Sequence, residues 1–144
     1  MMRSDPVFVV AVVAFVLAIA VNIWLWVAFL PGVPLLAFLL EMSVVLKLVA
    51  FMVVSLIMVG LIGGLMGEVA LCRVVAGLAV ALALVGAAYG EMNVQIVVRQ
   101  IGPVDFAIAA LSRAESFGLI ALGLFVAVLS LALSHLRRPS RASA

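Results

Sequence analysis

Charged side chains are scarce in this chain. Its 144 residues include eight Lys and Arg and six Asp and Glu, so charged residues make up 10% of the sequence. A water-soluble domain usually carries charge on about a quarter of its residues. The chain therefore lacks the polar surface that a soluble fold of this size needs, and we expect its solvent to be a lipid bilayer.

Histidine and cysteine are scarcer still, with one of each in the chain. A single cysteine excludes an internal disulfide, and one His with one Cys does not supply the ligands of a zinc or haem site. We interpret Cys72 as a small packing residue near a helix end and His135 as part of a solvated helix end. The sequence thus predicts no metal site and no cofactor.

The motifs of soluble enzymes are also missing from the sequence. It contains no phosphate-binding glycine loop, no Ser/His/Asp or Cys/His constellation and no paired ligand cluster. The basic residues form no face outside the C-terminal tail, which argues against a nucleic-acid interface. We therefore expect a non-enzymatic protein whose partners are the lipid bilayer and other membrane proteins.

Long apolar runs are what the chain does contain. Apolar residues make up 69% of it, and its mean hydropathy is +1.53. A membrane core about 30 Å thick requires roughly 20 apolar residues per spanning helix. Four stretches carry no charge: Pro6–Leu40, Leu48–Gly67, Val74–Gly90 and Ser116–Ser134. The sequence predicts an all-α membrane protein, one four-helix domain over residues 1–136, with spans at about 7–30, 36–66, 69–90 and 104–136.

Helix breakers and polar segments place the connections between these spans. Pro31 and Pro34 interrupt the first helix, because proline lacks the amide donor and restricts the residue before it. Pro103 suits the first turn of the last helix. The more polar segment 91–102 is expected to connect the third and fourth spans, and 137–144 is expected to be a basic cytoplasmic tail. The first apolar run is longer than a typical signal-peptide core, so we expect it to be retained as a span.

The distribution of Lys and Arg predicts that both ends of the chain face the cytoplasm. Positive charge concentrates in cytoplasmic loops, and aromatic belts mark the membrane boundaries. In this N-in/C-in topology the aromatic residues Trp24, Trp26 and Tyr89 lie at outer helix ends, and Arg99 lies outside. The inner side carries Arg3, Arg73, Arg137, Arg138 and Arg141.

Four charged residues lie near or within the predicted helices: Glu41, Lys47, Arg113 and Glu115. A charge at mid-membrane costs roughly 2.5–3.5 kcal/mol and usually marks a functional site. Arg113 and Glu115 point about 200° apart on one helix, so they cannot pair with each other. Three interpretations stay open: all four snorkel at the outer interface, Lys47 pairs with Glu115 between helices, or Glu115 handles a proton or ion.

Small residues recur at four-residue spacing along the predicted helices. In lipid, helices associate through close backbone approach, which small residues permit. The pairs are Gly60 with Gly64, Gly63 with Gly67, Gly86 with Gly90, and Ala114 with Gly118. They indicate either packing inside the bundle or a subunit interface.

Two stretches in the second half of the chain follow a known pattern. Leu84–Met92 reads as a leucine-glycine helix end, and Ala114–Leu124 combines an early acidic residue with a later Gly-Leu pair. Residues 84–130 thereby resemble the paired third and fourth helices of the MotA/TolQ/ExbB proton-channel family. The matching positions are Gly86, Gly90, Glu115, Gly123 and Leu124.

The resemblance implies an oligomeric ring around a single-span partner that supplies the key ionisable residue, in a bacterial inner membrane. Ala87 and Ile120 stand where family members commonly carry threonine, and the family's large cytoplasmic extension is replaced by a short turn near Glu68. The sequence therefore predicts a channel- or stator-like subunit that couples ion movement to a partner. The alternative is a structural accessory subunit of a larger membrane complex, with no transport path.

Overall fold

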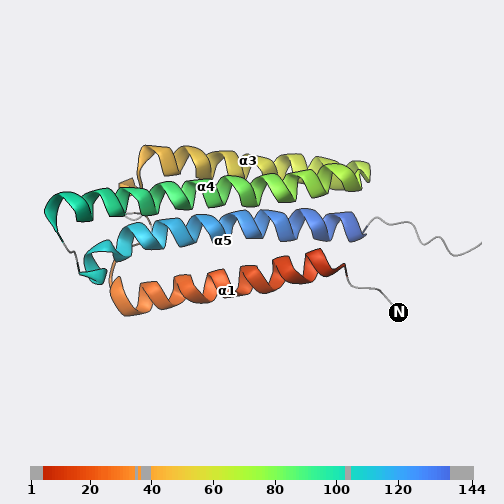
Figure 1. Ribbon diagram of the computed structural model, residues 1–144. Helices are drawn as coiled ribbons and strands as arrows, with labels where there is room; N and C mark the ends of the chain where they lie inside the picture. The colour runs from red at the N-terminus through yellow and green to blue at the C-terminus, as the bar shows by residue number, and fades with distance from the viewer. Residues whose placement is uncertain (1–4, 35, 37–39, 103–104, 137–144) are drawn as a thin grey trace, which may run out of the picture.

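The chain folds into an up-and-down bundle of four long helices (Figure 1). The computed structural model describes residues 5–34, 36, 40–102 and 105–136. The helices are α1 (Pro6–Phe29), α3 (Val44–Met66), α4 (Val69–Ile101) and α5 (Phe106–Leu136). All four are long and apolar enough to cross a membrane. The prediction of an all-α membrane protein is therefore confirmed.

Both ends of the described chain lie at the same end of the bundle, where α1 begins and α5 ends (Figure 1). We call this the terminal end, and we call the opposite end, where α3 and α5 begin, the loop end. An even number of crossings requires the two chain ends to lie on one side of the membrane. Which side faces the cytoplasm stays a prediction, and the residues Arg3, Pro103, Arg137, Arg138 and Arg141 lie outside the described part.

Capping residues fix where the first two long helices begin. The side chain of Asp5 accepts a hydrogen bond from Val7 N at 3.1 Å, and Pro6 follows in the first turn of α1. The side chain of Ser43 accepts one from Leu46 N at 3.3 Å at the start of α3. An N-cap side chain satisfies an amide that has no partner within the helix.

The start of α3 differs from the prediction. The sequence placed it near residue 36, because apolar residues continue from there, whereas the helix begins at Val44 after a break at Met42 and Ser43. The capping serine explains the difference, since its preferred backbone is not helical. The break leaves Glu41 on a separate segment.

The end of α4 also differs from the prediction. The sequence placed it at Gly90 and read the polar residues that follow as a connection, but the helix continues for three more turns to Ile101. Gly90 is buried within the helix, and the amide of Gln95 donates to Glu91 Oε1 at 3.0 Å one turn along. The chain ends this helix at Gly102, whose φ is 91°. Polarity there marks where the helix leaves the apolar layer, and not where it ends.

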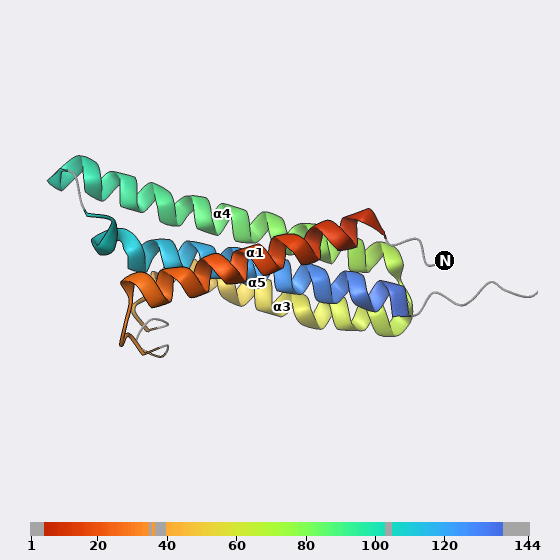
Figure 2. The ribbon, with the colours of Figure 1, turned by 90° about the horizontal axis from the view of Figure 1, so that it is seen from below.

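The helix α5 lies at the centre of the bundle. It packs against α1, α3 and α4, and α3 also packs against α4. The share of buried residues in the most apolar stretch rises from 11% in α1 to 44% in α5. The end of α4 extends beyond the other helices at the loop end (Figure 2). The outward faces of α1, α3 and α4 are consequently the surfaces left open to lipid or to another membrane protein.

Candidate functional site

The loop end holds an ionic contact between α4 and α5. Arg113 Nε lies 3.7 Å from Glu91 Oε2, and the Arg113 guanidinium lies 4.5 Å from the centre of the Phe106 ring. Both charged side chains are partly exposed. The pairing matches the prediction that Arg113 and Glu115 point apart, since Arg113 turns towards α4.

Glu115 is the buried charge of the loop end. It is 7% exposed. Its carboxyl group interacts electrostatically with the Lys47 amine and the Glu41 carboxylate. Among the described residues no donor lies within hydrogen-bonding distance of its carboxylate. The amine of Lys47 instead donates to the Leu40 carbonyl at 2.7 Å, so the ion pair considered from the sequence is not formed. The structure thus brings the predicted charged residues to one end, with Glu115 inside and Lys47 and Glu41 exposed.

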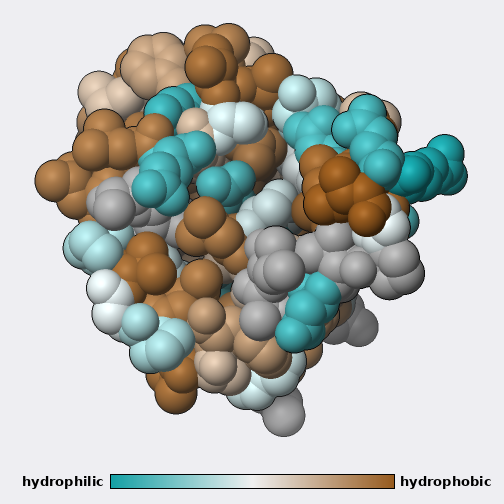
Figure 3. Space-filling model, turned by 90° about the vertical axis from the view of Figure 1, so that its left-hand side faces the viewer, coloured by the Kyte–Doolittle hydropathy of each residue, from teal (hydrophilic) through white to brown (hydrophobic). Residues whose placement is uncertain are grey.

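Aromatic side chains join α1 to α5 beside these charges. The rings of Trp24 and Phe29 lie 5.4 Å apart, and the rings of Phe29 and Phe106 lie 4.8 Å apart. Figure 3 looks at this end of the bundle and shows hydrophilic side chains lying among hydrophobic ones. Such a mixture is typical of the boundary between hydrocarbon and headgroups.

The terminal end holds a second charged cluster, which sequence reasoning did not identify. Asp5 Oδ2 lies 3.3 Å from Arg73 Nη2 and 3.8 Å from His135 Nε2. The His135 ring also meets Phe8 edge-on, with ring centres 5.5 Å apart. The cluster ties α1, α4 and α5 together. Because its members are far apart in sequence, the spacing of residues gave no signal for it.

The two charged ends are separated by about the thickness of a bilayer core. A rise of about 1.5 Å per residue puts about 27 Å between Arg73 and Glu91 along α4, and about 30 Å between Glu115 and His135 along α5. A hydrocarbon core is about 30 Å thick. Glu115 therefore lies at one boundary of the apolar layer and not at its middle.

The apolar layer between the charged ends contains no Asp, Glu, Lys, Arg or His on the described helices. Two of its polar side chains bond to their own helices: Ser55 Oγ donates to Phe51 O at 2.8 Å, and Asn22 Nδ2 donates to Ala18 O at 3.2 Å. Helical serine commonly bonds in this way. The described residues of one copy therefore supply no chain of acidic, basic or histidine side chains across this layer.

Most of the glycines singled out in the sequence lie at helix contacts inside the bundle, but Gly67 is exposed at the end of α3, where its φ is 77° and an added methyl group would meet nothing within 4 Å. A methyl group added at Gly64 would lie 2.8 Å from Leu133 Cβ, and one at Gly60 would lie 2.5 Å from Ser130 Oγ. Added methyl groups at Gly86 and Gly90 would collide with Leu119 and Ser116 of α5 respectively. The packing around Gly118 is less tight, since a methyl group added there would lie 3.7 Å from Asn22 Oδ1.

A further row of small residues lies on the outward side of α4 and was not recognised in the sequence. Its members are all exposed, and we call them the small-residue face: Ala70, Gly77, Ala81 and Ala88. Spacings of seven and four residues keep them on one side of a helix. A methyl group added at Gly77 would meet nothing within 4 Å. The Gly77-Ala81 spacing was a signal that the sequence did contain.

The outward side of α3 differs from this face. Its apolar exposed residues are Val, Leu, Ile, Phe and Met, such as Phe51 at 71% and Met58 at 63% exposure. Large apolar side chains suit direct contact with lipid, whereas small ones let another backbone approach closely. The outward side of α4 thus differs from that of α3 by its row of small residues, beside which Val74 and Val85 are also exposed, at 63% and 66%.

Comparisons of the chain with protein-family models, with curated proteins and with solved structures gave no match. The resemblance to the MotA/TolQ/ExbB family therefore stays a prediction from the quoted residues.

Proposed function

We propose that this integral membrane protein is a non-enzymatic accessory subunit of a larger membrane complex, held there through the small-residue face of α4. The observation that carries the proposal is the exposure of Ala70, Gly77, Ala81 and Ala88 along one line of a spanning helix. Membrane helices associate where small residues allow close approach. The occupant we propose is an apolar spanning helix of another protein.

The charge at the end of this face favours a partner over a second copy. Arg99 follows Ala88 by eleven residues, which keeps it on the same side of α4, and its side chain is exposed. Two copies related by an axis along the membrane normal would bring Arg99 opposite Arg99, and like charges that face each other oppose binding. A partner helix with a carboxylate near this position satisfies the charge.

The lack of acidic, basic and histidine residues in the described apolar layer supports the accessory role over a conducting one. A path through a single copy would have to cross about 27 Å between Arg73 and Glu91 without an Asp, Glu, Lys, Arg or His side chain on the described helices. Intramembrane ion routes are usually marked by such side chains.

Co-purification of the tagged full chain from its native membrane in mild detergent tests the proposal. The wild-type chain should retain a second membrane protein, and Ala81→Leu should lose it. Ala20→Leu is the matched control, because it places the same residue on the exposed surface of α1. A chain that purifies alone, a complex that contains only copies of this chain, or equal loss in both variants would contradict the proposal.

A second function, the coupling of ion movement to a partner, is favoured by Glu115. This residue is 7% exposed at the edge of the apolar layer, and Lys47 is the nearby cation. The resemblance to proton-channel subunits places a matching glutamate there. A partner that supplied the missing ionisable group could complete a path at its contact with this chain.

Proton flux into liposomes that contain the chain and its co-purified partner tests this second function. Glu115→Gln should abolish the flux, while Glu68→Gln, an exposed carboxylate at the terminal end, should not change it. Absence of flux in the wild-type complex, or flux that is equal in both variants, would exclude it.

A further inference from the structure

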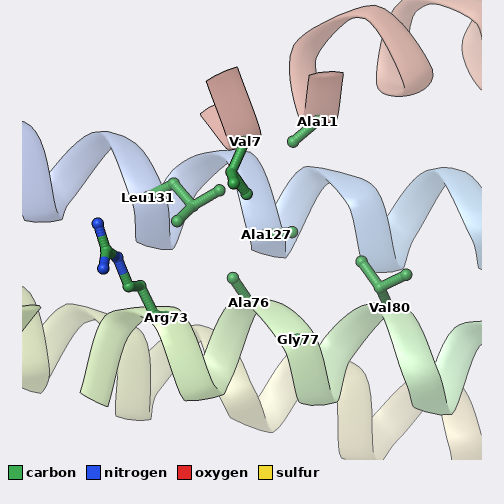
Figure 4. A pocket seen from close by; sticks show the side chains of 8 residues that line it. All are labelled: Val7, Ala11, Arg73, Ala76, Gly77, Val80, Ala127 and Leu131. Carbon is green, nitrogen blue, oxygen red and sulfur yellow. The ribbon is translucent and has the colours of Figure 1, made fainter. Parts of the chain in front are cut away.

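A lateral groove opens between α1 and α4 near the terminal end of the bundle (Figure 4). Its volume is about 480 Å³. Ala76, Gly77 and Ala127 form part of its lining, Val7 and Ala11 form the wall from α1, and Arg73 lies at its end. The two outer helices pack on α5 on either side, so α5 forms the floor.

The small side chains of α4 and α5 explain why the groove is not filled by the chain itself. Gly77 has no side chain, and the atom that a larger residue would place there meets nothing within 4 Å. Ala76 and Ala127 are buried in a cluster with Leu131, beside Phe8 and Ala11 of α1. The groove is thus apolar along its length and open towards lipid.

The single charged residue of the groove lies at the membrane boundary. Arg73 is the residue that begins the apolar layer on α4, and its side chain is 55% exposed. One guanidinium nitrogen contacts Asp5, but a guanidinium carries five N–H donors, so others remain for a second anion. Basic pockets between membrane helices bind anionic lipid headgroups.

We propose that the groove binds one anionic phospholipid of the adjacent leaflet, with an acyl chain between α1 and α4 and its phosphate at Arg73. The apolar lining matches the chain, and the boundary position of Arg73 matches the depth of the phosphate. Gly77 belongs both to the groove and to the small-residue face, whereas Ala81 belongs to the face and does not line the groove, so substitutions at these two positions distinguish the lipid from a partner helix.

Native mass spectrometry of the full chain in mild detergent, with phosphatidylglycerol or phosphatidylcholine added, tests the site. We expect one phosphatidylglycerol retained per copy in preference to phosphatidylcholine. Arg73→Gln should weaken its retention by about fivefold. Arg99→Gln, an exposed arginine at the other end of α4, should have no effect. Equal retention of the two lipids, or equal behaviour of the two arginine variants, would overturn the proposal.

A groove-filling variant separates the lipid from other occupants. Gly77→Leu should abolish retention without harming the fold, because its added Cβ meets nothing, and Ala81→Leu should retain the lipid, because Ala81 does not line the groove. Retention of the lipid by Gly77→Leu would overturn the proposal. A partner protein that is displaced by Gly77→Leu and not by Ala81→Leu would also overturn it, because that partner would then occupy the groove. These lipid-retention results do not depend on whether the chain binds a partner protein through the small-residue face.

Discussion

The inner and outer faces of α4 carry the same kinds of residue in different surroundings. The inner face has Ala79, Ala83, Gly86 and Gly90, which are buried against α5 and α3. The outer face has the exposed row from Ala70 to Ala88. Small residues on the inner face let α5 approach the α4 backbone. We propose that the small residues on the outer face allow the helix of another protein to approach in the same way.

Breaking the inner contact should have the largest effect on stability. Gly123 of α5 faces Ala83, and a methyl group added there would lie 2.8 Å from the carbonyl oxygen of Ala79. Because a backbone atom cannot move aside, we expect Gly123→Leu to lower the free energy of unfolding by about 1–3 kcal/mol. Denaturant titration of the purified chain measures this loss, and Gly77→Leu is the glycine control. A Gly123→Leu chain as stable as the wild type would contradict the close packing of α4 on α5.

Reversing the charge at the end of the outer face should weaken binding and leave the fold intact. Arg99→Glu replaces the exposed cation with an anion, so a partner carboxylate would be repelled. Titration of the purified partner against the variant should give a several-fold weaker Kd, with Arg99→Lys close to the wild type. Equal Kd values for the wild type, Arg99→Glu and Arg99→Lys would show that no partner carboxylate contacts Arg99.

Removing the ionic contact beside the inner face should have a smaller effect. Glu91→Gln breaks the contact with Arg113, and both side chains are partly exposed. Exposed pairs contribute about 0.2–1 kcal/mol, so a loss within that range is expected. The same denaturant titration measures it. A loss of several kcal/mol would mean that this pair, and not the small residues, holds α4 against α5.

A change confined to the outer face should have the smallest effect on stability. Ala81→Leu adds an apolar side chain to an exposed position of a membrane-spanning helix. Surface substitutions of this kind change stability by about 0.5 kcal/mol or less. Thermal unfolding of the purified chain should therefore match the wild type. A clear loss of stability would show that the face packs against this chain after all.

The four spans could be predicted from the sequence because charge avoids hydrocarbon. The predicted spans 7–30 and 104–136 match α1 and α5 to within two residues. The start of α3 and the end of α4 were wrong, because capping by Ser43 and helix continuation past Gly90 depend on local backbone geometry. The polarity of the residues indicates how deep a segment lies in the membrane, but it does not indicate where the helix ends.

The candidate sites were only partly visible in the sequence. The opposite directions of Arg113 and Glu115 follow from helix geometry alone. The cluster of Asp5, Arg73 and His135 could not be predicted, because it depends on how three helices are arranged. The sequence contains small residues on both sides of α4. Which side stays exposed depends on where α3 and α5 pack, and this packing could not be predicted from the sequence.

Photocrosslinking in the native membrane tests most directly whether the outer face of α4 contacts another protein. A photoreactive amino acid replaces Ala81 or Ala88 on this face, and Met58 on the exposed side of α3 serves as the control. We expect a protein adduct with one membrane partner from both α4 positions and lipid adducts from position 58. Lipid adducts alone from all three positions would contradict it.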